Sequence, residues 1–219
     1  MTSLVGLPTF VNVLQRNGRR GPMKTDWDCI EFVHTAGWEA RDRDDDELAD
    51  FEELTAWCVR RDNLTDEEAV AFLSQARKQP DRAAETLVGA HRLRVLTYEL
   101  LRAVARHEVP PAGRVEELNG LLQKLLSGRR LANEARAFHW AWRMDPYRPD
   151  TMLAPVVWSL AALVTSEERD RLKLCEADDC GWIFIDASRN RSRRWCDMSD
   201  CGNRAKVRRY RRRRGTGAP

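Results

Sequence analysis

The spacing of apolar residues predicts a mainly helical chain. Leucine and aromatic residues recur every three or four positions over several stretches, as they do on the buried face of a helix. The expected helices span residues 47–60, 65–79, 81–107, 113–127 and 150–165. A shorter apolar stretch, DCIEFVHT at 28–35, fits either a short buried strand or a helix.

Local signals set some of the helix ends. The sequence TDEE from Thr65 to Glu68 forms a capping box, in which each side chain can bond the other residue's amide, so a helix begins there. Pro80 is expected to stop that helix. Ser166 is expected to open a further short helix that leads toward Cys175.

Two other stretches alternate in the manner of β-strands. Aromatic residues occupy every second position from Phe138 to Trp142, and residues 129–135 can supply a partner strand. Residues 182–186, WIFID, also alternate and are followed by turn residues at 188–191. We therefore expect residues 193–195 to form the return strand of a second hairpin, which gives the fold a small β component.

Charge is distributed unevenly along the chain. Residues 171–219 hold 14 Lys and Arg against 6 Asp and Glu, whereas the rest of the chain is acidic overall. A basic end on an acidic body favours contact with a polyanion. No apolar run is long enough to span a membrane, and residues 1–25 lack the pattern of a secretory signal. We therefore expect a cytoplasmic protein, associated with the nucleoid, that has no membrane partner.

Four of the six cysteines lie close together, as Cys175, Cys180, Cys196 and Cys201. Two C-x4-C pairs separated by a short segment can converge on one Zn²⁺, and in the cytosol such a cluster favours metal over disulfides. Four reduced cysteines or two disulfides are the alternatives, but so small a segment is hard to stabilise without a staple. Four thiolates fill every coordination position, so the zinc is expected to be structural.

A basic helix is expected to begin near residue 203, directly after the last cysteine. Its lysine and arginine side chains form a cationic face, while Val207 and Tyr210 lie on another face and could pack on the hairpin. A knuckle, a hairpin and a helix in this order make a treble-clef-like zinc finger. The residues expected to contact nucleic acid are Arg189, Asn190, Arg191, Arg193, Arg194, Asn203, Arg204, Lys206, Arg208, Arg209, Arg212 and Arg213.

Other roles for these basic and polar residues stay open. Arg193, Arg194 and Arg204 could instead neutralise the zinc–thiolate cluster, which carries a formal negative charge. Asn203 could cap the helix, and we favour that role slightly. The whole run of charge could also be a solvated tail.

The segment CEADDCGWIFIDASRNRSRRWCDMSDCGNRAKVRRYRRRR closely resembles the CGNR zinc finger, whose namesake motif begins at Cys201. The stretches EFVHTAGW, LADFEELTAW, LRVLTYELLRAVA and APVVWSLAALVTS resemble the helical ABATE domain that normally precedes this finger. The family is described as stress-induced bacterial transcription regulators, so the resemblance implies zinc binding by the four cysteines and DNA binding by the finger. His34 departs from the family, which usually has Asn in an FVNT motif.

The resemblance also gives a domain plan. It comprises an N-terminal extension over residues 1–25, a helical ABATE-like sensing or dimerisation domain over 26–170, the zinc finger over 171–214 and a tail over 215–219.

The leading hypothesis is a zinc-dependent transcription regulator that binds double-stranded DNA. A single finger covers few base pairs, so we expect a homodimer that reads two half-sites. Aromatic residues of the helical part are either core or the lining of a pocket for a small-molecule effector. The candidates for such a pocket are His34, Trp38, Trp57, Trp140 and Trp142.

Two other classes of function stay open. The chain could be an RNA- or ribosome-associated zinc protein, or an adaptor whose basic helix docks on an acidic protein. We do not expect an enzyme, because the sequence has no nucleophile–base set, phosphate-binding loop or open metal site.

Overall fold

The structure of the protein, a computed structural model, describes residues 27–37, 46–134 and 137–215. For residues 134, 137 and 212–215 it describes the backbone alone. The expected extension at 1–25 and most of the tail lie outside the described residues, as does Trp38.

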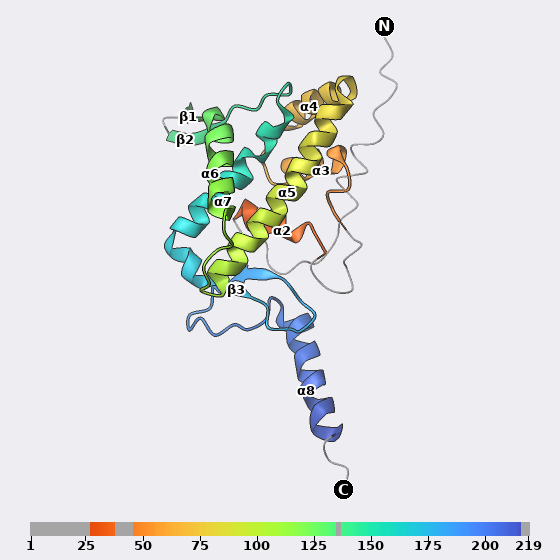
Figure 1. Ribbon diagram of the computed structural model, residues 1–219, viewed down its shortest axis with the longest axis vertical. Helices are drawn as coiled ribbons and strands as arrows, with labels where there is room; N and C mark the ends of the chain where they lie inside the picture. Colours follow the sequence, from red (N-terminus) through yellow and green to blue (C-terminus); the bar gives the residue numbers. More distant parts are fainter. Residues whose placement is uncertain (1–26, 38–45, 135–136, 216–219) are drawn as a thin grey trace. The chain divides into compact units, whose positions relative to one another are not determined.

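The expected fold class, mainly α with a small β component, is confirmed (Figure 1). The helices are α2 (Asp28–His34), α3 (Phe51–Arg60), α4 (Asp66–Lys78), α5 (Pro80–Ala105), α6 (Arg114–Leu125), α7 (Ala154–Thr165) and α8 (Asn203–Gly215). The strands are β1 (Arg129–Glu134), β2 (Ala137–Trp142), β3 (Leu172–Leu174) and β4 (Ile183–Ile185). Short helical turns lie at Leu126–Gly128, Pro149–Leu153, Glu167–Arg171 and Met198–Gly202.

The helix ends follow the local signals in the sequence. The Thr65 hydroxyl accepts a hydrogen bond from the Glu68 amide, and the Glu68 carboxylate accepts one from the Thr65 amide, so the capping box is complete. α4 ends at Lys78, and Pro80 opens α5, because proline tolerates the first turn of a helix but not its interior. Residues 28–35, which fitted either a strand or a helix, form α2.

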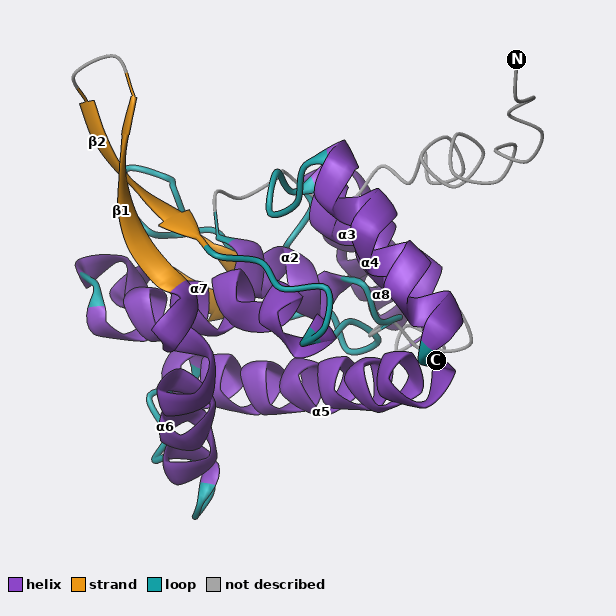
Figure 2. Cartoon of the chain, turned by 90° about the horizontal axis from the view of Figure 1, so that it is seen from above, coloured by secondary structure: helices purple, strands orange, loops and turns teal. Residues whose placement is uncertain are grey.

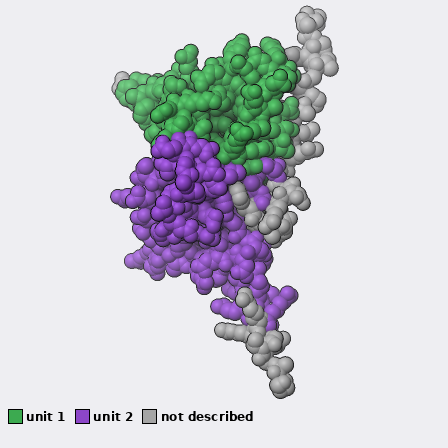
Figure 3. All heavy atoms as spheres, in the orientation of Figure 1, with its two compact units in different colours: residues 1–21, 47–94, 118–158 green, residues 22–46, 95–117, 159–219 purple. Residues whose placement is uncertain are grey.

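The chain divides into two compact units, coloured separately in Figure 3. Among the described residues, unit 1 takes 47–94 and 118–158, and unit 2 takes 27–37, 46, 95–117 and 159–215. Both units therefore draw on separate stretches of sequence, and α5, α6 and α7 contribute residues to both. The expected division of the chain into consecutive domains stays a prediction.

Unit 1 has a core of leucine and aromatic side chains. Leu54 and Phe72, on the neighbouring helices α3 and α4, are almost completely buried, as are Trp57 and Leu153. The strands β1 and β2 form a two-stranded antiparallel ribbon (Figure 2). This confirms the strands expected around residues 129–142.

The ribbon of unit 1 is anchored at one end by an arginine. The Arg129 guanidinium lies 3.2 Å from the ring centroid of Trp158 and 4.2 Å from that of Trp140. Such stacking holds a cation against aromatic faces and fixes the base of the ribbon. Farther along β2, the side chain of Phe138 is 74% exposed.

Unit 2 contains α2 and the cysteine-rich segment. On α2, Ile30 and Phe32 are completely buried, and the Cys29 amide donates a hydrogen bond to the Ser159 hydroxyl. The strands β3 and β4 pair antiparallel, with Lys173 opposite Phe184.

The predicted pairing of the strand WIFID with residues 193–195 is wrong. β4 pairs with β3, which precedes the first cysteine, and residues 193–195 form no strand. The reason lies at Asp186, whose buried carboxylate accepts a hydrogen bond from the Arg193 amide. That bond ties the returning chain to a side chain, so the returning chain makes no backbone ladder with β4.

Within the residues that the structure describes, no helix is both long enough and apolar enough to cross a membrane.

Candidate zinc centre and basic surface

The four cysteine sulfurs converge. Their Sγ atoms all lie within 4.8 Å of one another, with Cys180 and Cys196 3.7 Å apart and Cys196 and Cys201 3.6 Å apart. A tetrahedron of Zn–S bonds of about 2.3 Å separates neighbouring sulfurs by about 3.8 Å. A disulfide would bring two sulfurs to about 2 Å, and all four residues are free thiols. The four cysteines therefore fit one structural zinc ion.

The protonation chemistry of the cluster also favours a cation. Hydrogen bonds with Cys175 and Cys180, together with burial, raise the pKa of Cys196 above that of an ordinary thiol. Thiols this close cannot all ionise without a nearby positive charge, because each new thiolate repels the others. Zinc binds thiolates, so its binding would release these protons and stabilise the folded segment.

Backbone amides of the first three cysteines make hydrogen bonds that help to place these ligands. The Cys175 amide donates to the Trp182 carbonyl and so extends the pairing of β3 with β4. The Cys180 amide closes a turn onto the Ala177 carbonyl. The Cys196 amide points at the Cys175 sulfur, 3.5 Å away. The first ligand is thus held by an extension of the β3–β4 pairing, and the third by a hydrogen bond to the sulfur of the first.

The last ligand, Cys201, sits in a helical turn that leads directly into α8. Asp197 caps this turn by accepting hydrogen bonds from the Ser199 and Asp200 amides. The prediction that Asn203 caps the helix is wrong, because its side chain donates to the Ser199 carbonyl one turn back. The cap falls at Asp197 because the helical turn starts before the CGNR motif.

Gly202 leaves room for packing on this turn. A Cβ at this position would lie 3.2 Å from the Met198 sulfur and 3.6 Å from the Trp195 ring. The glycine that follows Cys201 therefore lets these side chains close over the start of α8.

Asp186 joins several segments of the finger by hydrogen bonds, and the sequence patterns above do not predict this role. Its side chain is completely buried and accepts bonds from the Lys173 ammonium, the Ser188 hydroxyl and the Arg193 amide. Burial by itself would raise the pKa of Asp186, but these donors lower it overall, so the carboxylate is ionised. The signal in the sequence was an acidic residue that ends a buried strand and precedes a serine two positions later.

Several of the basic residues expected to meet nucleic acid are engaged within the finger. Arg204 donates to the Cys201 sulfur at 3.0 Å and pairs with Asp179 and Asp200. Arg208 also pairs with Asp179, at 3.2 Å. These contacts join the start of α8 to the zinc ligands and to the first cysteine pair.

The two arginines after the turn at residues 188–191 also make contacts within the finger. Arg194 pairs with Glu176, and Arg193 donates to the Trp195 and Cys196 carbonyls and stacks on Phe184. Neutralising the charge of the thiolates, the alternative role for these arginines, therefore fits Arg204, which contacts a ligand sulfur, better than it fits Arg194.

A second group of cations is exposed. Among the side chains that the structure describes, these residues have no carboxylate partner: Arg189, Arg191, Lys206, Arg209 and Arg211. Asn190, between the first two, is exposed too. The side chains of Arg212 and Arg213 lie outside the described part. Val207 and Tyr210 are about half exposed, and their packing on the hairpin stays a prediction.

His34 connects α2 to the zinc-binding segment. Its Nε2 lies 2.9 Å from the Ile183 carbonyl, and its ring lies 3.8 Å from that of Trp182. Burial lowers the pKa of His34 to about 3, so the ring is neutral at pH 7 and donates its N–H to this carbonyl. The residue that departs from the family pattern is thus a packing contact onto the strand after Cys180.

The residues expected to line an effector pocket occupy several different surroundings. Trp57 is a buried core residue of unit 1, Trp140 and Trp142 lie on β2 around Arg129, and His34 belongs to unit 2. A pocket built from these residues stays a prediction.

A mainly helical chain that closes with four converging cysteines and a basic helix is a zinc-finger protein. Residues 171–214 match the CGNR zinc finger. Residues 29–167, which are more than half of the chain, match the ABATE family, described as "Putative stress-induced transcription regulator", and the chain belongs to this family. No curated protein gives a significant match.

Proposed function

We propose that this zinc-binding protein is a transcription regulator that contacts double-stranded DNA through its finger. One observation carries the proposal. The cations of the finger divide into a set paired with carboxylates and a set exposed without such partners, among the described side chains. Paired arginines fix a helix in place, whereas exposed cations remain available to phosphates.

The exposed set occupies two places in the finger. Lys206, Arg209 and Arg211 lie on α8, which Figure 1 shows leaving the cysteine loops as one continuous helix. Arg189 and Arg191 flank Asn190 on the turn after β4. The helix cations supply phosphate contacts, and the turn offers side chains that can hydrogen-bond base edges.

The rest of the chain serves regulation in this proposal. We propose that the helical part senses a small molecule and pairs two copies, because one finger reads too few base pairs for useful specificity. Analytical ultracentrifugation at micromolar concentration should show a dimer. We do not propose an enzyme, because four protein sulfurs leave no open coordination position on the zinc.

The test measures affinity for random-sequence duplex DNA with the zinc-loaded chain. If about 4–6 phosphates are contacted, log affinity falls against log salt with a slope of about −4 to −5. The double variant K206Q/R209Q should make this slope shallower by about 2 units. The matched control R77Q/K78Q removes the same charge from exposed positions on α4 and should leave the slope unchanged.

Two results would refute the proposal. Affinity that K206Q/R209Q and R77Q/K78Q lower equally would show that only net charge matters. Structured RNA that displaces the duplex at much lower concentration than competing DNA would identify an RNA-binding protein instead.

A further inference from the structure

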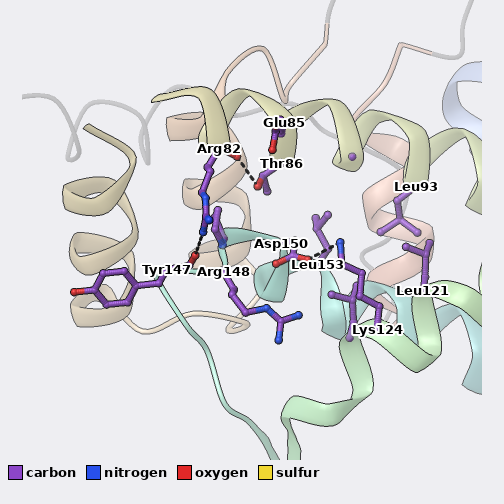
Figure 4. A pocket seen from close by; sticks show the side chains of 13 residues that line it. Arg82, Glu85, Thr86, Leu93, Leu121, Lys124, Tyr147, Arg148, Asp150 and Leu153 are labelled. Carbon is purple, nitrogen blue, oxygen red and sulfur yellow. Dashed lines mark hydrogen bonds and ion pairs between the residues drawn. The ribbon is translucent and has the colours of Figure 1, made fainter. Parts of the chain in front are cut away.

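Unit 1 contains a pocket, and none of the residues that the sequence predicts for an effector pocket lines it. Its volume is about 330 Å³, and its walls come from α5, α6 and the segment between Tyr147 and Leu153 (Figure 4). This volume is at the lower end of the range of small-molecule sites in proteins.

One end of the pocket is apolar. Leu93 and Leu121 lie there in Figure 4, and Leu125 and Leu153 add further buried surface. Gly89 completes this wall from the middle of α5, and no atom lies within 4 Å of the place its Cβ would occupy. Glycine disfavours a helix interior, and here it keeps open the space into which a side chain would project.

Charged side chains line the rest of the pocket, and the protein does not fully neutralise them. Lys124 pairs with Asp150 at 2.8 Å, so these two charges cancel. Arg82 uses one guanidinium nitrogen on the Tyr147 carbonyl. Neither Arg82 nor Arg148 has a carboxylate partner among the described residues. With Glu85 as the remaining acid, the lining has a net charge of one positive unit.

We infer that this pocket binds a small monocarboxylate with an apolar body, its chain against the leucines and its carboxylate at Arg148. Guanidinium groups bind carboxylates with paired, charge-assisted hydrogen bonds. Glu85 opposes a second negative charge, which disfavours phosphates and dicarboxylates. This inference rests on the proposed role of the helical part as a sensor and names the chemical class of its ligand.

The test titrates octanoate into the zinc-loaded full chain and follows binding by calorimetry. The variant G89L places a side chain in the pocket and should weaken octanoate binding by about tenfold or more. R148Q should weaken it by about tenfold through the lost charge-assisted bond. The matched control G120L makes the same change at an exposed glycine on α6 that also has open space, and it should bind as the unmodified protein does.

Three outcomes would overturn the inference. They are no binding of octanoate at about 10 mM, equal binding of octan-1-ol or octylamine, and undiminished binding by G89L. The measurement contains no DNA, so its result is independent of the finger. A chain that binds octanoate but no DNA would refute the proposed regulator alone, and one that binds DNA but no octanoate would refute the pocket alone.

Discussion

Single residues in the finger each satisfy several partners at once. Arg204 illustrates this, because one guanidinium reaches the Cys201 sulfur and the carboxylates of Asp179 and Asp200. Hydrogen bonds to a ligand sulfur tune a metal site, and ion pairs orient the helix that carries the arginine. This arginine of the CGNR motif is therefore used inside the finger, which agrees with the second of the two roles that the sequence left open for it.

His34 allows its two contacts to be separated by substitution. H34F keeps a ring near Trp182 but leaves the Ile183 carbonyl without its donor, and we expect it to lower the free energy of unfolding by about 1–3 kcal/mol. H34Q keeps a donor and loses the stacking, and we expect it to lower the free energy of unfolding by about 0.5–1.5 kcal/mol. H34A should cost more than either. Urea denaturation with an intact zinc site measures all three, and an H34A protein as stable as the unmodified one would contradict this role.

At the scale of elements, the features set by neighbouring residues were predictable. The capping box at Thr65, the break at Pro80 and the spacing of the cysteines are local, and the structure has all three. The pairing of β4 was not predictable in the same way, because the segment before the first cysteine and the chain that returns after the turn both flank it. Asp186 decides that choice through a buried carboxylate, and alternation of apolar residues carries no information about such a side-chain contact.

The zinc finger shows the same contrast between features that neighbouring residues set and features that depend on distant contacts. Convergence of the four sulfurs follows from their spacing, but which arginines are exposed depends on where the acidic residues of the first cysteine pair fall. Asp178 and Asp179 reach Arg208, and Asp179 reaches Arg204 as well. Nothing in a count of charges separates these arginines from Lys206 or Arg209.

This division gives a prediction for α8. D178N/D179N removes two negative charges and releases Arg208, so duplex affinity should rise several-fold, because each exposed ion pair contributes only about 0–1 kcal/mol to holding the helix. D66N/E67Q makes the same change in charge at exposed positions of α4 and should raise affinity much less. Fluorescence anisotropy at fixed salt compares them. Weaker binding by D178N/D179N would mean that these pairs orient α8 for DNA.

At the scale of the whole molecule, stability comes from two different sources. Unit 1 has its own apolar core, in which Leu54, Trp57 and Phe72 are buried. The finger has only a small buried cluster around its cysteines, with Phe184 and Ala177. A cluster of that size depends on metal, because the binding free energy of zinc is also folding free energy.

Removal of zinc should therefore affect the chain unevenly. Chelation under reducing conditions, or the variant C201S, should abolish amide protection in β4 and at the start of α8. α3 and α4 should keep theirs, because their core consists of their own side chains. α2 should lose part of its protection, since His34 bonds the Ile183 carbonyl of β4.

Hydrogen exchange read by mass spectrometry resolves these segments, and C58S, at a buried cysteine outside the cluster, is the control for loss of a thiol. Uniform loss of protection in α3, α4 and β4 would show that zinc holds the whole chain together, and unchanged protection of β4 would exclude a structural metal.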